Sequence, residues 1–87
     1  MIPAPLQLVL YGRAGCHLCE AMEAELSPHL ERNGLGLVRI DISGQSGLEA
    51  RFGTAIPVLT CGDEEICRHF FDLERFQIQL SDLGLIR

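Results

Sequence analysis

The chain has 87 residues, a length typical of one domain around one hydrophobic core. Its net charge is −5 and its seven basic residues are scattered, so it lacks the basic cluster expected of a protein that binds nucleic acid or an anionic membrane. The first residues carry no basic side chain, and the apolar residues 6–11 are too few for a signal peptide or a membrane span. We therefore expect a monomeric, cytoplasmic protein with a single domain over residues 1–87.

Strand and helix patterns alternate in the first half of the chain. Residues 6–11 form a short apolar run of strand-forming residues, which predicts a strand covered on both faces. An amphipathic helix follows and ends at Asn33-Gly34, because apolar residues recur at every fourth position. These residues are Leu18, Met22, Leu26 and Leu30. Pro28 lacks a backbone donor and disfavours a helical Ser27, so we expect a kink or restart near Ser27.

The second half adds a hairpin and a closing helix. Residues 37–42 predict a strand and residues 47–52 a short helix. Residues 57–61 and 65–70, joined by a Gly-containing turn, predict two antiparallel strands. Asp72 is suited to cap a last helix with one apolar face. The residues of that face are Leu73, Phe76, Leu80 and Leu83. The order βαβαββα predicts an α/β fold with one mixed sheet covered by helices.

The motif Cys16-His17-Leu18-Cys19 follows the first strand and opens the first long helix. In a reducing cytoplasm, closely spaced cysteines are more often catalytic or metal-binding than structural. The sulfur of Cys16 would face unpaired N–H groups and the positive end of the helix dipole, which stabilise a thiolate by about 1–2 kcal/mol, or roughly one pKa unit. Cys16 is therefore the predicted nucleophile, and Cys19, one helical turn later, the predicted resolving thiol.

Other interpretations of the polar residues remain open. His17 would stabilise the thiolate further if protonated, whereas Glu20 and Glu23 would oppose it. A chance pair of cysteines, a redox-inactive adaptor and a redox-sensing binding module are the alternatives to an enzyme. His29 and His69 have no partner at ligand spacing and are expected to be ordinary surface or half-buried residues.

The second cysteine pair, Cys61 and Cys67, lies on the predicted hairpin at unequal distances from its turn. This spacing does not by itself bring the two sulfurs together, so buried, unreactive thiols are favoured. A zinc site made from all four cysteines is the metal alternative, but the gap between Cys61 and Cys67 exceeds the usual spacing of zinc ligands. We therefore expect no metal.

Three segments carry a resemblance to a known family. They are Tyr11-Gly12-Arg13-Ala14-Gly15-Cys16-His17-Leu18-Cys19, Ile56-Pro57-Val58-Leu59 and Phe71-Asp72-Leu73. In these segments the chain resembles the glutaredoxin-like proteins, in particular the short bacterial group with a Cys-His-Leu-Cys motif, and the match runs nearly end to end. The resemblance implies a thioredoxin-like fold with a four-stranded mixed sheet and three helices. It also implies that the Ile56–Pro57 peptide is cis and borders the cysteines, although only about 5–6% of X–Pro bonds in folded proteins are cis.

Glutaredoxins hold glutathione with a basic residue before the cysteines, with the backbone beside the cis-proline, and with a Gly-Gly-x-Asp turn. The resemblance assigns the first two roles to Arg13 and Ile56. The third segment differs, because residues 69–72 are His-Phe-Phe-Asp, and bulky rings replace glycines that let a ligand approach the backbone. We therefore expect no bound cofactor, iron–sulfur clusters included, with glutathione the less favoured alternative. The expected partners are disulfide-containing proteins or small molecules and another thiol system, such as thioredoxin, as electron donor.

Overall fold

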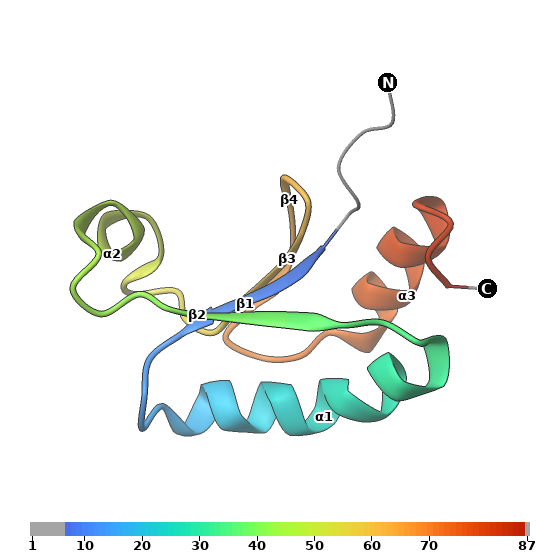
Figure 1. The fold of residues 1–87 in the computed structure, drawn as a ribbon, viewed down its shortest axis with the longest axis horizontal. Coiled ribbons are helices and arrows are strands. Elements are labelled where there is room, and N and C mark those ends of the chain that lie inside the picture. Colours follow the sequence, from blue (N-terminus) through green and yellow to red (C-terminus); the bar gives the residue numbers. More distant parts are fainter. Residues whose placement is uncertain (1–6, 87) are drawn as a thin grey trace.

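A four-stranded mixed sheet with helices on both faces forms the centre of the protein (Figure 1). The structure is a computed structural model and describes residues 7–86. In chain order the elements are β1 (Leu8–Gly12), α1 (His17–Asn33), β2 (Leu37–Asp41), α2 (Ser46–Phe52), β3 (Val58–Cys61), β4 (Glu64–Arg68) and α3 (Leu73–Asp82). This order confirms the predicted βαβαββα fold, which is that of a thioredoxin-like protein.

The strand order is β2-β1-β3-β4, so β1 lies inside the sheet and not at its edge. β1 pairs in parallel with β2 and antiparallel with β3, and β3 pairs antiparallel with β4. The parallel pair requires a crossover connection, which α1 supplies. The carboxyl end of β1, where the chain turns into α1, therefore has a neighbouring strand on each side.

The two faces of the sheet carry separate apolar clusters, because side chains alternate along each strand. On one face, Leu10 and Leu59 oppose each other and pack with residues of α1 and α3, including Leu26 and Phe76. On the other face, the opposed pair Tyr11 and Val58 packs with α2 and the residues around it. The ring of Tyr11 stacks on Phe52 of α2 at a centroid distance of 4.5 Å. Each helix is thus held by one face of the sheet.

Helix α1 runs without interruption through Ser27 and Pro28, so the restart expected near Ser27 is wrong. The Ser27 hydroxyl donates a 2.8 Å hydrogen bond to the Glu23 carbonyl, as a helical serine commonly does. Leu26 and Leu30 are buried on either side of the proline. Packing of both halves against the sheet therefore outweighs the loss of one backbone hydrogen bond. Helix α1 ends where predicted, with Gly34 in the left-handed conformation at φ 64°.

Several predicted boundaries and buried residues differ from the structure. β1 begins at Leu8 and includes Gly12, and Leu6 lies outside the described residues. The predicted fourth strand, residues 65–70, is shifted: β4 ends at Arg68 because His69 adopts a left-handed φ of 67°. Leu73 and Leu83 are exposed, since they stand at the two ends of α3 while its middle packs on the sheet. Asp72 caps α3 as predicted, accepting the Arg75 N–H at 3.0 Å.

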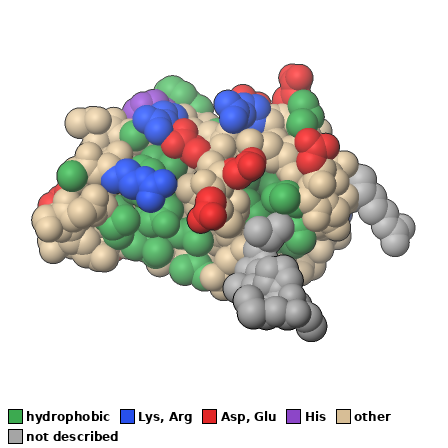
Figure 2. Space-filling model, turned by 90° about the horizontal axis from the view of Figure 1, so that it is seen from above, with side chains coloured by type: hydrophobic (Ala, Val, Ile, Leu, Met, Phe, Trp, Pro, Cys, Tyr) green, Lys and Arg blue, Asp and Glu red, His purple; other side chains and the backbone are tan. Residues whose placement is uncertain are grey.

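The face of the molecule opposite α1 mixes apolar side chains with arginines and carboxylates (Figure 2). Charges of both signs lie close together on it, and hydrophobic side chains are exposed between them. Within residues 7–86, no helix has both the length and the apolar character needed to cross a membrane.

Candidate redox site

The turn between β1 and α1 positions Cys16 as the N-cap of the helix. Gly15 has a φ of 76°, a conformation that favours glycine, and the Cys16 N–H donates to the Arg13 carbonyl at 3.3 Å. Cys16 itself is extended, with φ −83° and ψ 110°, and its Sγ accepts the N–H of Cys19 at 3.1 Å. A sulfur in this place faces the positive end of a 17-residue helix. The predicted setting for a stabilised thiolate is present.

Cys19 lies one helical turn behind Cys16, and a disulfide joins the two residues. Their Cα atoms are 5.2 Å apart, within the range that a disulfide spans without backbone movement. Cys16 is half-buried, whereas Cys19 is 9% exposed. The outer sulfur can therefore meet a partner while the inner sulfur stays covered.

Gly12, the last residue of β1, makes room for Cys19, and sequence reasoning gave it no such role. A Cβ atom at position 12 would lie 2.8 Å from Cys19 Sγ, closer than nonbonded atoms approach, and 3.3 Å from Cys19 Cβ, a tight contact. The available signal was a glycine at the end of the predicted strand, four residues before Cys16. Only a glycine lets the end of β1 approach the sulfur this closely.

Ile56 and Pro57 meet the site from the β3 side. The peptide between them is cis, as the resemblance implied. Tyr11 pairs with Val58, so the antiparallel register brings Pro57 beside Gly12 at the end of β1. Pro57 is fully buried, and Ile56 is half-buried against the α2 cluster. The register therefore places this loop next to the strand end that carries the cysteine turn.

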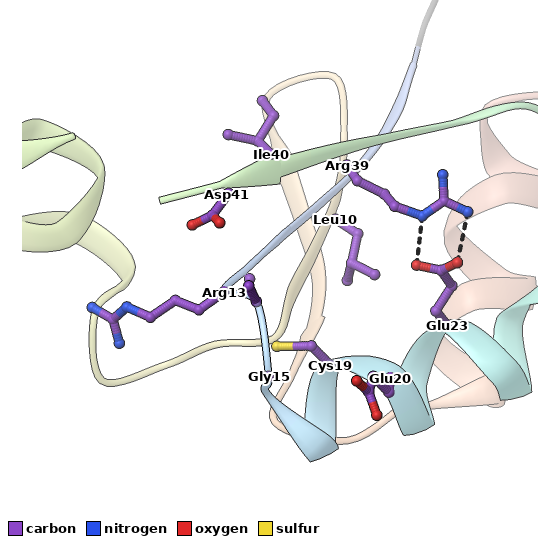
Figure 3. Close-up of a pocket in the computed structure, with 11 residues that line it drawn as sticks. Leu10, Arg13, Gly15, Cys19, Glu20, Glu23, Arg39, Ile40 and Asp41 are labelled. Carbon is purple, nitrogen blue, oxygen red and sulfur yellow. Dashed lines mark hydrogen bonds and ion pairs between the residues drawn. The ribbon is translucent and has the colours of Figure 1, made fainter. Parts of the chain in front are cut away.

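Arg13 holds the cysteine turn to the α2 region. Its guanidinium forms an ion pair with Glu49 at 3.0 Å and donates to the Gly53 carbonyl at 3.3 Å. In the close-up it extends away from Cys19 (Figure 3). His17, in contrast, is fully in solvent, and its nearest acidic atom is Glu20 Oε2 at 3.9 Å. In this structure Arg13 acts as a tether, and His17 is free to meet a partner.

Asp41, at the end of β2, lies opposite Gly12 beside the same turn. It was not among the predicted site residues. Its carboxylate accepts the Ser43 backbone N–H at 2.8 Å. The hydrogen bonds from Ser43 lower the pKa of Asp41, and the backbone N–H of Ala14 and the charge of Arg13 lower it further. Asp41 is therefore held ionised at the end of β2, opposite Gly12 and beside the turn that carries Cys16.

A family model described as the Glutaredoxin-like domain (DUF836) matches residues 7–81, nearly the whole chain. The chain belongs to this glutaredoxin-like family. It therefore combines a redox-type thioredoxin fold with a Cys16–Cys19 pair at the start of α1. Among curated proteins, no match is found.

Solved structures support the assignment of this glutaredoxin-like protein. Protein Ne2328 from Nitrosomonas europaea is 34% identical and superimposes with a TM-score of 0.78, over 91% of this chain and 95% of that one. Protein XcR50 from X. campestris is 28% identical, with a TM-score of 0.63 over 86% of this chain and 96% of that one. A buckwheat glutaredoxin solved with glutathione is 17% identical, with a TM-score of 0.56 over 94% and 83%, and shows the fold alone.

Residues 69–72, which precede α3, carry bulky side chains where a Gly-Gly turn would have none. The backbone of the first of them nevertheless has a glycine-like conformation. His69 has the left-handed φ of 67° that glycine adopts without strain, and its N–H donates to the Pro57 carbonyl at 2.8 Å. Phe70 is 70% exposed. Phe71 packs edge-on against Phe76 at 5.5 Å. The backbone of His69 therefore meets Pro57, while Phe71 packs into the core beside α3 and Phe70 lies at the surface.

The other two cysteines of the glutaredoxin-like protein are buried and unbonded, which confirms the expectation of separate core thiols. Cys61 pairs across the hairpin with Glu64, whereas Cys67 pairs with Leu59, so the two are not opposite each other. Burial raises the pKa of both thiols. Nowhere in residues 7–86 do three or more His, Cys, Asp or Glu side chains gather as a metal site would require.

We expect Cys61 and Cys67 of the reduced protein to react with Ellman's reagent at least about a hundredfold more slowly than Cys16. The reagent needs a thiolate at the surface, whereas these two thiols are buried and resist ionisation. Mass spectrometry of partly labelled protein would identify the thiol that reacts first. Labelling of either core cysteine at the rate of Cys16 would contradict the expectation.

Proposed function

We propose that this protein is a dithiol oxidoreductase that reduces disulfides of partner proteins, with Cys16 as nucleophile and Cys19 as resolving thiol. The observation that carries the proposal is the position of Cys16 Sγ at the N-terminus of α1, where it accepts the Cys19 N–H at 3.1 Å. Amide dipoles at a helix N-terminus stabilise a thiolate, which is the reactive form in disulfide exchange.

The reaction has two exchange steps. The thiolate of Cys16 attacks one sulfur of the partner's disulfide, which forms a mixed disulfide and releases the other partner sulfur as a thiolate that takes up a proton. The Cys19 thiol then loses its proton and attacks Cys16 Sγ, which closes the Cys16–Cys19 disulfide and frees the second partner thiol. Two electrons pass from the protein to the partner, whose two thiolates take up one proton that Cys19 releases and one from the solvent, because Cys16 reacts as a thiolate. The observed disulfide is the oxidised product of this cycle.

The different solvent exposure of Cys16 and Cys19 supports different roles for the two cysteines. Cys16 is the more exposed sulfur and can meet a bulky partner, whereas Cys19 is 9% exposed and reaches only Cys16. The inner thiol is therefore suited to resolve an intermediate and not to form one. This arrangement supports Cys16 as the attacking group and Cys19 as the resolving group.

Return to the reduced state requires a thiol donor, for which we propose a dithiol protein of the thioredoxin kind. Glutathione is less suited, because Phe70 and Phe71 stand where glutaredoxins have an open glycine turn. In addition, Arg13 is engaged by Glu49 and Gly53, so its guanidinium is less available to an incoming anion. A small anionic thiol would therefore find little to hold it.

The proposal is tested by following insulin reduction with two electron sources in turn, thioredoxin with its reductase and glutathione with its reductase. We expect sustained turnover with the first and at least about tenfold slower turnover with the second. Turnover of hydroxyethyl disulfide with glutathione at rates usual for glutaredoxins would overturn the choice of donor. Oxidation of Cys16 and Cys19 without turnover by either donor would overturn the enzymatic function and favour a redox sensor.

A further inference from the structure

A pocket of about 280 Å³ opens between the first turns of α1 and the edge strand β2, and Cys19 forms part of its wall (Figure 3). The strand order places it on the β2 side of β1, opposite the side where Pro57 lies. Its volume is at the lower limit for small-ligand sites, and suits a single side chain better than a cofactor. We call it the β2-side pocket.

The interior of the β2-side pocket is apolar. The buried side chain of Leu10 extends into it from β1, and Gly12 and Gly15 leave space beside Cys19. An aliphatic side chain would bury its surface there without covering an unpaired polar group.

The mouth of the pocket carries an excess of negative charge. Glu23 and Arg39 neutralise each other through two hydrogen bonds of 2.6 Å, and Arg13 is paired with Glu49. Glu20 and Asp41 remain, both exposed and both lining the pocket. In the described part of the chain, Glu20 has only His17, at 3.9 Å, as a basic partner within 4 Å, and Asp41 has none. The mouth therefore attracts positive charge.

We propose that the β2-side pocket selects partner proteins in which an aliphatic residue and a lysine or arginine flank the target cysteine. This inference rests on the proposed function. Cys16 is the N-cap of α1, and its neighbours Gly15, Cys19 and Glu20 line the pocket, so the pocket mouth is within reach of residues that flank a partner cysteine bonded to Cys16. The aliphatic side chain enters beside Leu10, and the basic side chain meets Glu20 and Asp41.

Four peptide disulfides test the proposal. Each peptide has one cysteine followed by Leu or Ser and then by Arg or Glu, and each is supplied as its symmetrical disulfide. The reduced wild-type protein is mixed with each peptide in a single turnover, and its oxidation is followed by alkylation and mass spectrometry. We expect the Leu peptides to react about tenfold faster than the Ser peptides, and the Arg peptides about threefold faster than the Glu peptides at low salt.

Matched variants locate the charge preference. Glu20→Gln should lower the Arg-over-Glu rate ratio to about half, because Asp41 remains, whereas Glu31→Gln, an exposed carboxylate near the far end of α1, should leave the ratio unchanged. Equal rates with Leu and Ser peptides, equal rates with Arg and Glu peptides, or the same effect from both variants would overturn the inference.

Hydroxyethyl disulfide separates this inference from the proposed function. If the wild-type protein reduces hydroxyethyl disulfide and all four peptides at the same rate, the proposed function stands and the proposed selectivity is wrong. If it reduces none of them, both the proposed function and the proposed selectivity are wrong.

Discussion

Replacing Cys16 with serine should lower insulin reduction at least about a thousandfold, because in residues 7–86 no other cysteine is both accessible and placed at a helix N-terminus. Cys19→Ser should fail in a different way. Its Cys16 thiolate still attacks the partner, but nothing resolves the mixed disulfide, so a covalent complex accumulates. Turnover measured with thioredoxin and its reductase, followed by non-reducing electrophoresis, distinguishes the two variants.

Cys67→Ala is the matched control for both variants. It removes a buried thiol outside the site and should leave turnover near the wild-type rate. Folding is best compared among reduced proteins, because loss of a disulfide across so short a loop alone lowers the free energy of unfolding by about 2 kcal/mol. Near-normal turnover by a folded Cys16→Ser variant would contradict the assignment of the nucleophile. A Cys19→Ser variant that cycles freely would contradict the role of the resolving thiol.

Gly12→Ala should raise the reduction potential of the Cys16–Cys19 pair by about 20–60 mV. The added methyl group would lie 2.8 Å from Cys19 Sγ. In the oxidised protein this sulfur is fixed by its bond to Cys16, whereas in the reduced protein the thiol can rotate away. Overpacking of about 1–3 kcal/mol therefore falls mainly on the disulfide, and about 30 mV corresponds to 1.4 kcal/mol for two electrons.

Equilibration in dithiothreitol redox buffers, followed by alkylation and mass spectrometry, measures the shift. Gly36→Ala is the control, because a Cβ at position 36 would have no atom within 4 Å. An equal shift in both variants, or a lower potential for Gly12→Ala, would show that contact with Cys19 does not govern the pair.

The sequence predicts those parts of the site that local patterns determine. A strand, a glycine turn and a helix place Cys16 at an N-cap and Cys19 one turn later, and the structure confirms both. Leu18, which the four-residue spacing places in the apolar row of α1, is 43% exposed and not part of the core. Four residues rotate by about 400° around a helix axis, so side chains at every fourth position drift by about 40° per step. Leu26 faces the sheet, and Leu18, two steps earlier, therefore points away from it. Cys19 takes the buried place instead.

Contacts within the site between residues far apart in the chain could not be predicted from the sequence. Arg13 and Glu49 lie 36 residues apart, and no local pattern indicates that they pair. The same holds for Asp41, which meets the cysteine turn only because β2 pairs with β1 in parallel. The cis peptide before Pro57 could be predicted only from the family resemblance, because most X–Pro peptide bonds are trans.

The interior position of β1 has a consequence for electron flow. Because the cysteine turn leaves a strand with neighbours on both sides, the edge strand β2 lies on one side of the turn and the loop before β3 on the other. In the cycle that we propose, an oxidised client and a reducing enzyme would then not need to compete for one docking surface, although both exchange with the same sulfur. Selection can then adjust the affinity for either of them independently.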